Sequence, residues 1–188
     1  MPVTYHSRTG TIYYLHSGPK RGGSVQHFFS TKPDGTLADR VPDGFEIYET
    51  VNGQVYLRRA QPKLIFDEEL AQLRQRLTKP RPGFRYKMEA RGNVITIHES
   101  ESRLSELRGR MPSWALPPDD GFEERFATFQ AVLRFTLVDA ERRLFAPERY
   151  CFRGSVDDWI TLGPPGTLAK LATRYMTHLG KDSFFELF

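Results

Sequence analysis

The sequence predicts an α+β protein: a strand-rich N-terminal small sheet or open barrel, then a mixed antiparallel sheet with two or three helices. Three observations lead to this prediction. Short runs rich in β-branched and aromatic residues alternate with Gly, Pro and Asn turn signals over the first 60 residues. A strict alternation of residues over 125–138 indicates a long strand. Two further segments have the spacing of amphipathic helices.

The first 60 residues are expected to form a small β module of five short strands. The strands are predicted at residues 3–7, 11–16, 25–31, 45–50 and 54–59. Asn52 and Gly53 join the last two, and Asn-Gly is the strongest short-range signal for a β-hairpin. We therefore expect a module over residues 1–60, with an α+β domain over residues 61–188 packed on it.

A helix over about residues 67–78 is expected to link the two parts. Its apolar residues recur at i, i+4, i+7 and i+11, namely Phe66, Leu70, Leu73 and Leu77. Three acidic residues in its first turn and two arginines near its end complement the helix dipole. The Pro-rich segment 79–83 then ends the helix.

The second part is predicted to begin with a hairpin of residues 84–90 and 94–99, followed by a short helix near 102–108 and an irregular connector over 111–121. The long strand over 125–138 is expected to have two alternating rows of side chains, one from Ala127 to Leu137 and one from Phe126 to Thr136, with one of its faces on the core. Residues 148–153 and 159–162 are predicted to continue the same sheet.

The last helix follows a Gly-Pro-Pro-Gly segment, with Thr167 as the predicted N-cap and Gly180 as the C-terminal glycine. Its apolar face comprises Leu168, Leu171, Ala172, Tyr175, Met176 and Leu179. The tail over 183–188 is too apolar to stay in solvent, so it should dock onto the core or onto a protein partner. In the second case Phe184, Phe185 and Phe188 would make the contact.

Composition limits the class of protein. The start of the chain lacks the apolar segment of a signal peptide, and no run of about 18 apolar residues is present, so we predict a soluble cytoplasmic protein without membrane contact. Cys151 is the only cysteine, which excludes an internal disulfide and a cysteine-based zinc site within one chain. No cofactor motif is present, and we predict neither a cofactor nor a metal.

The charge is unevenly distributed along the chain. The net charge is +4, and residues 1–91 hold 15 Lys and Arg against 9 Asp and Glu, whereas residues 92–188 hold 12 against 14. An excess of cations attracts polyanions such as nucleic acid. The candidate anion-binding residues are Lys20, Arg21, Arg58, Arg59, Arg81, Arg85 and Lys87.

Several other patterns suggest chemistry but have simpler structural readings. Gly18–Ser24 and Gly163–Thr167 are able to hold an anion, yet Gly- and Pro-rich turns are most often connectors. Cys151 lies in a predicted strand without an activating neighbour, so we expect a structural cysteine. The five histidines lack metal-ligand spacing, although His6, His16 and His27 lie on three adjacent predicted strands. Asp157 and Asp158 are expected in a turn.

Three function hypotheses follow. The first is a noncatalytic binding module whose basic half contacts nucleic acid or another polyanion. The second is a protein–protein adaptor or accessory subunit that uses its aromatic residues and its C-terminal tail. The third is an enzyme of unidentified class with Asp157 or Cys151 in a cleft, and we rank it last because no catalytic motif is present.

Overall fold

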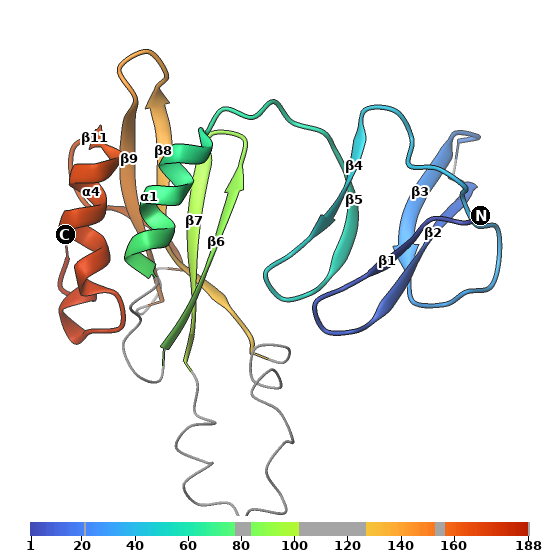
Figure 1. Cartoon of the computed structure of the whole chain (residues 1–188), viewed down its shortest axis with the longest axis horizontal. Coiled ribbons are helices and arrows are strands. Elements are labelled where there is room, and N and C mark those ends of the chain that lie inside the picture. Colours follow the sequence, from blue (N-terminus) through green and yellow to red (C-terminus); the bar gives the residue numbers. More distant parts are fainter. Residues whose placement is uncertain (21, 78–83, 102–126, 153–156, 188) are drawn as a thin grey trace, which may run out of the picture. The chain divides into compact units, whose positions relative to one another are not determined.

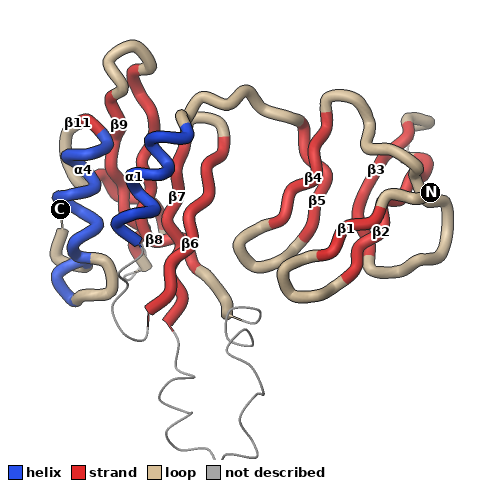
Figure 2. The backbone as a smooth tube through the Cα atoms, in the orientation of Figure 1, coloured by secondary structure: helices blue, strands red, loops and turns tan. Residues whose placement is uncertain are grey.

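The structure is a computed structural model, and it describes residues 1–187 except 21, 78–83, 102–126 and 153–156. The described residues fall into two compact units (Figure 1). The first unit takes in Met1–Gln61 and Ala127, and the second takes in the described residues of Pro62–Leu116 and Thr128–Phe188. Among the described residues, strands dominate both units and the helices lie in the second (Figure 2), so the predicted α+β class is confirmed.

The first unit contains a three-stranded antiparallel sheet and a separate hairpin. The sheet has the order β1-β2-β3, with β1 at Thr4–His6, β2 at Ile12–Pro19 and β3 at Val25–Ser30. The hairpin pairs β4, Phe45–Glu49, with β5, Val55–Arg59. Gly53 has a φ of 79° in the turn between them, which explains the Asn-Gly signal.

A single carboxylate connects the two sheets of the first unit. The Tyr5 hydroxyl donates to Glu49 Oε2 at 2.9 Å, and the backbone N–H of Arg8 donates to Glu49 Oε1 at 2.8 Å. Leu15 and Val55 are the buried apolar side chains among the described residues of this unit, at 0% and 4% exposure. With so small a core, these charge-assisted hydrogen bonds contribute directly to holding β4 beside β1.

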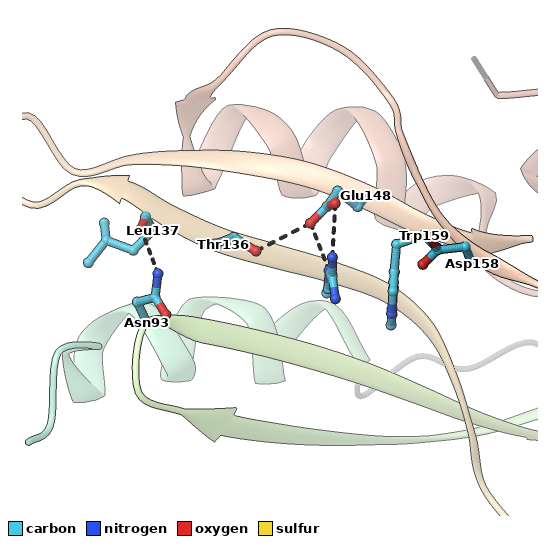
Figure 3. Close-up of polar contacts among 7 residues, drawn as sticks. Asn93, Thr136, Leu137, Glu148, Asp158 and Trp159 are labelled. Atoms are coloured by element: carbon cyan, nitrogen blue, oxygen red, sulfur yellow. Dashed lines mark hydrogen bonds and ion pairs between the residues drawn. The ribbon is translucent and has the colours of Figure 1, made fainter. Parts of the chain in front are cut away.

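The second unit is built on a six-stranded antiparallel sheet. Its strands are β6 (Phe84–Arg91), β7 (Val94–Glu101), β8 (Gln130–Asp139), β9 (Leu144–Cys151), β10 (Asp158–Thr161) and β11 (Gly166–Thr167). The order is β10-β9-β8-β7-β6, and β11 pairs with β9. The β6–β7 turn is tied to β8 because the Asn93 side chain donates to the Leu137 carbonyl at 3.1 Å (Figure 3).

Two α-helices cover one face of this sheet (Figure 1). They are α1, Asp67–Leu77, and α4, Leu168–Tyr175, which is followed by the 3-10 turns η2, Met176–His178, and η3, Asp182–Phe184. The predicted apolar face of the last helix is buried in full, in one cluster with Ile95, Ile97, Leu133, Phe135 and Phe145 of the sheet. Helix-on-sheet burial of this kind supplies the main apolar driving force of the unit.

Some local expectations differ from the structure. Phe66 does not join the buried stripe of α1: it is 53% exposed, and the guanidinium of Arg143 lies 4.0 Å above its ring. The alternation of the long strand is interrupted, because a bulge between Ile97 and His98 shifts the register against β8. Thr167 takes the N-cap position with extended backbone, yet its side chain makes no capping hydrogen bond.

Other expectations concern residues that the structure does not describe, namely the short helix near 102–108 and the connector over 111–121. Gly180 has a φ of 70°, as its predicted place after the last helix requires. Among the described residues, no helix has the length and apolar character needed to cross a membrane.

Candidate functional site

The face of the six-stranded sheet opposite α1 and α4, called the open face below, carries charged and aromatic side chains. Alternation along each strand decides which residues belong to it, since Met88, Ile97, Leu133 and Phe145 lie in the core on the other side. Its described members include Arg85, Lys87, Glu89, Arg91, Val94, Thr96, His98, Ser100, Ala131, Arg134, Thr136, Val138, Ala146, Glu148, Tyr150, Trp159 and Thr161.

One edge of the open face is a row of cations on β6. Arg85, Lys87 and Arg91 alternate with Tyr86, Met88 and Ala90, which pack against the core. The row contains one carboxylate, Glu89. Residues two apart on a strand lie about 6.6 Å apart on the same face, so these cations present a linear array.

The β6 row lies beside a buried ring and a half-buried imidazole. Lys87 Nζ is 4.9 Å from the ring centroid of Phe129, which is 4% exposed. His98 stands directly opposite Lys87 in the ladder. Burial lowers the pKa of His98, and the charge of Glu89 opposes that shift only in part. At neutral pH the imidazole is therefore uncharged, and the positive charge of this edge comes from the β6 side chains.

The other edge of the open face carries rings and carboxylates from β9 and β10. Arg134 of β8 donates to Glu148 from Nε at 2.7 Å and from Nη2 at 3.0 Å, and Thr136 donates to the same carboxylate at 3.3 Å (Figure 3). The Arg134 guanidinium lies 4.3 Å from the centroid of the Trp159 ring. The charge of Arg134 is thus neutralised within the sheet, while its plane supports the indole.

The structure distributes the predicted anion-binding residues over both units. Lys20 is exposed in the β2–β3 turn, and Arg59 is exposed at the end of β5. Arg58 is occupied within the first unit, because it pairs with Glu46 at 2.7 Å and lies 4.0 Å above the Tyr48 ring. Arg85 and Lys87 belong to β6 of the second unit. Arg21 and Arg81 lie outside the described residues.

The charge asymmetry of the sequence does not follow the structural units. Residues 1–61 hold seven Lys and Arg against five Asp and Glu, a net +2, whereas residues 62–91 hold eight against four, a net +4. Residues 62–91 belong to the second unit, and the division after residue 91 cuts the β6–β7 hairpin. The strongest local excess of cations is therefore on β6, not on the N-terminal strands.

The two glycine-rich segments form connections. In the β2–β3 turn, the Lys20 N–H donates to the Ser24 carbonyl at 2.8 Å and the Gly23 N–H donates to the Lys20 carbonyl at 3.0 Å. These amides close the hairpin and do not converge on an anion. In the second segment, Gly166 and Thr167 pair with β9 as the short strand β11.

The histidines and aspartates that the sequence analysis considered as metal-binding or catalytic residues do not form a cluster among the described residues. His16 is buried, its Nε2 lies 2.9 Å from the Lys32 carbonyl, and its ring stacks on Phe28 at 5.2 Å. His27 lies on the opposite face of that sheet from His16, because Ser17 is its ladder partner. Within the described ranges, no three His, Cys, Asp or Glu side chains are grouped as metal ligands require. Asp157 is exposed and accepts the Tyr150 hydroxyl at 3.0 Å.

The C-terminal tail docks on the second unit. Phe184 is 4% exposed within the core cluster. Arg149, also 4% exposed, donates to the carbonyls of Phe185 and Leu187, both at 3.1 Å. Beside this anchor lies an apolar pocket of about 200 Å³ lined by Arg149, Cys151, Phe152 and Phe185. Phe184 is thus a core residue, and Phe185, at 50% exposure, is the exposed ring among the described residues of the tail. Phe188 lies outside the described residues.

Sequence reasoning missed the ring cluster of β9 and β10. On the strand that carries the cations, Phe84 and Tyr86 alternate with Arg85 and Lys87, so alternation predicts rings and cations on opposite faces. The rings come from the β9–β10 pair: residues 148–151 pair with residues 158–161, which brings Trp159 opposite Tyr150. Comparison with known proteins adds no relative, because no family model, curated protein or solved structure matches this chain.

Proposed function

We propose that the chain is a noncatalytic binding module that contacts nucleic acid or another polyanion through the open face of its six-stranded sheet. The observation that supports this proposal best is the row of Arg85, Lys87 and Arg91 on β6. Phosphate binding requires clustered cations and no particular motif, so a linear array of cations along one strand is sufficient in principle.

The surroundings of the row strengthen the proposal. The segment from residue 79 to residue 91 contains five Lys and Arg and one Glu. Among the described strands, β6 is the last in the order of its sheet, with β7 as its paired neighbour. Lys20 and Arg59 of the first unit enter the proposal as two further exposed cations.

Fluorescence anisotropy with a labelled 20-nucleotide single strand tests the proposal at low salt. The variant Lys87→Gln/Arg91→Gln should bind at least about ten-fold more weakly, because each lost phosphate contact removes a share of the counterion-release free energy. The matched control is Arg74→Gln/Lys170→Gln, which removes two exposed cations from α1 and α4. Equal losses in both variants would show that net charge, and not the β6 row, governs binding.

A second candidate function, a protein–protein adaptor, is favoured by one observation. Two large exposed rings, Phe152 at 58% and Phe185 at 50%, flank the apolar pocket beside the tail. Exposed aromatic side chains around a pocket are typical anchors of protein interfaces. An adaptor role predicts that Phe185→Ala weakens association with the partner while the free energy of unfolding stays within about 1 kcal/mol of the parent value.

A further inference from the structure

Three rings form what we call the aromatic corner, at the β9–β10 edge of the open face: Tyr150, Phe152 and Trp159. The centroids of Tyr150 and Phe152 are 4.6 Å apart with planes at 50°, and those of Tyr150 and Trp159 are 5.2 Å apart with planes at 89°. Phe152 is 58% exposed. Because the planes differ, the corner combines ring faces and ring edges.

The corner already holds one cation. The Arg134 guanidinium lies 4.3 Å from the Trp159 centroid, and Glu148 fixes it through two hydrogen bonds (Figure 3). The side chain of Trp159 is therefore held by its neighbours before any partner arrives. Such preorganisation reduces the entropy that binding costs.

Two carboxylates make the corner electronegative. Asp157 accepts the Tyr150 hydroxyl at 3.0 Å, and Asp158 accepts the Trp159 backbone N–H at 2.7 Å, while both aspartates are exposed. The hydrogen bond to Asp157, and further the negative charges of Asp157 and Asp158, raise the pKa of Tyr150. Of the nearby described cations, Arg134 is paired with Glu148, and Arg149 is buried and donates to the tail carbonyls.

We propose that the aromatic corner binds an arginine or lysine side chain of a partner polypeptide. Ring faces attract cations through their quadrupoles, the two carboxylates add opposite charge, and the exposed ring of Phe152 covers the aliphatic stem. This site is independent of the β6 row and selects a ligand of opposite charge. A stacked nucleobase fits the rings less well, because its phosphates would lie beside Asp157 and Asp158.

The experiment uses the full chain and a blocked pentapeptide with two arginines, compared with the same peptide carrying glutamine. Binding is followed by NMR through the indole N–H signal of Trp159, which a Trp159→Phe sample distinguishes from that of Trp114. We expect the arginine peptide to shift this signal and the glutamine peptide to bind at least five-fold more weakly, the range of a partly desolvated cation–π contact.

Variants separate the corner from a general surface effect. Phe152→Ala should weaken arginine-peptide binding about five-fold, and Phe152→Tyr should keep it within two-fold because the ring is retained. Asp157→Asn should also weaken binding, whereas Val138→Ala, which removes an apolar side chain 53% exposed on the same face, should not change it. The proposal is overturned by absence of binding, by equal binding of the glutamine peptide, by an unaffected Phe152→Ala variant, or by a single-stranded oligonucleotide that shifts the Trp159 signal more strongly than the peptide.

Discussion

The two adjacent phenylalanines of the tail give a direct test of how the second unit is held together. Phe184 is 4% exposed and Phe185 is 50% exposed, and their centroids are 5.8 Å apart. Replacing a buried Phe by Ala costs about 3–5 kcal/mol from lost transfer energy and the cavity left behind. The exposed ring contributes mainly the contact between the two rings, worth about 0.5–1.5 kcal/mol.

Phe184→Ala should therefore destabilise the second unit by about 3 kcal/mol more than Phe185→Ala does. With a urea m-value of about 2 kcal/mol per molar, the midpoint of unfolding should lie about 1.5 M lower in Phe184→Ala than in Phe185→Ala. The fluorescence of Trp159, which lies in β10, reports on this unit.

The control is built into the comparison, since the two variants make the same chemical change at neighbouring positions. If both midpoints fall equally, Phe184 is no more important to the core than Phe185. If neither moves, Phe184 is not a core residue and the tail is free to serve a partner. That result would refute the placement of Phe184 with Met176 and Leu179 in the core cluster.

Three further predictions follow from single residues. Burial lowers the pKa of His98, so the contribution of His98 to stability is complete above pH about 6.5 and declines as the pH falls toward the lowered pKa. When the free energy of unfolding is measured against pH, His98→Gln should show a weaker decline at acidic pH than the parent chain. The hydrogen bond to Glu49 raises the pKa of Tyr5, so the contribution of Tyr5 to stability is present below pH about 10 and is lost as the pH rises through the raised pKa. Circular dichroism should show a smaller loss of structure at alkaline pH in Tyr5→Phe than in the parent chain. Gly53→Ala should lower the melting temperature of the first unit, because φ at Gly53 is 79° and the added Cβ would lie 2.7 Å from Thr9 Cγ2. A melting temperature equal to that of the parent chain would contradict this prediction.

Local patterns in the sequence were sufficient for most elements. The stripe of Leu168, Leu171 and Tyr175 specifies α4 because its 3.6-residue period matches one buried face. The hairpins around Gly53 and Gly92 follow from turn chemistry, with φ values of 79° and 55°. These features depend on residues that lie within a few positions of one another in the sequence, and local composition and hydrophobic periodicity are sensitive to patterns over that distance.

Features that depend on pairing between strands were harder to predict. Arg149 occupies an inward position of β9 and is buried, which is unusual for a charged side chain. The burial is possible because carbonyls of the tail, nearly 40 residues later in the chain, accept its hydrogen bonds. The exposure of Phe66 likewise follows from Arg143, which approaches from the β8–β9 turn. No period in the sequence encodes either partner, so the alternation rule alone misassigns these residues.

The candidate site illustrates the same limit. The cations of β6 were identified from the sequence, but the counts of charge by halves assigned them to the wrong region, because the dividing line ran through a hairpin. The fold separates the open face into a cationic edge at β6 and an aromatic, acidic edge at β9 and β10. The two edges select ligands of opposite charge, so each needs its own probe.

The slope of log Kobs against log[NaCl], measured with a single-stranded 20-mer, tests the polyanion proposal most directly. Three phosphate contacts at the β6 row predict a slope of about −2, since each contact to a single strand contributes about −0.7. Lys87→Gln/Arg91→Gln should reduce the slope to about −0.7, whereas Arg74→Gln/Lys170→Gln should leave it unchanged. A flat line for the parent chain, or the same slope in the parent and the β6 variant, would contradict the assignment of polyanion binding to β6.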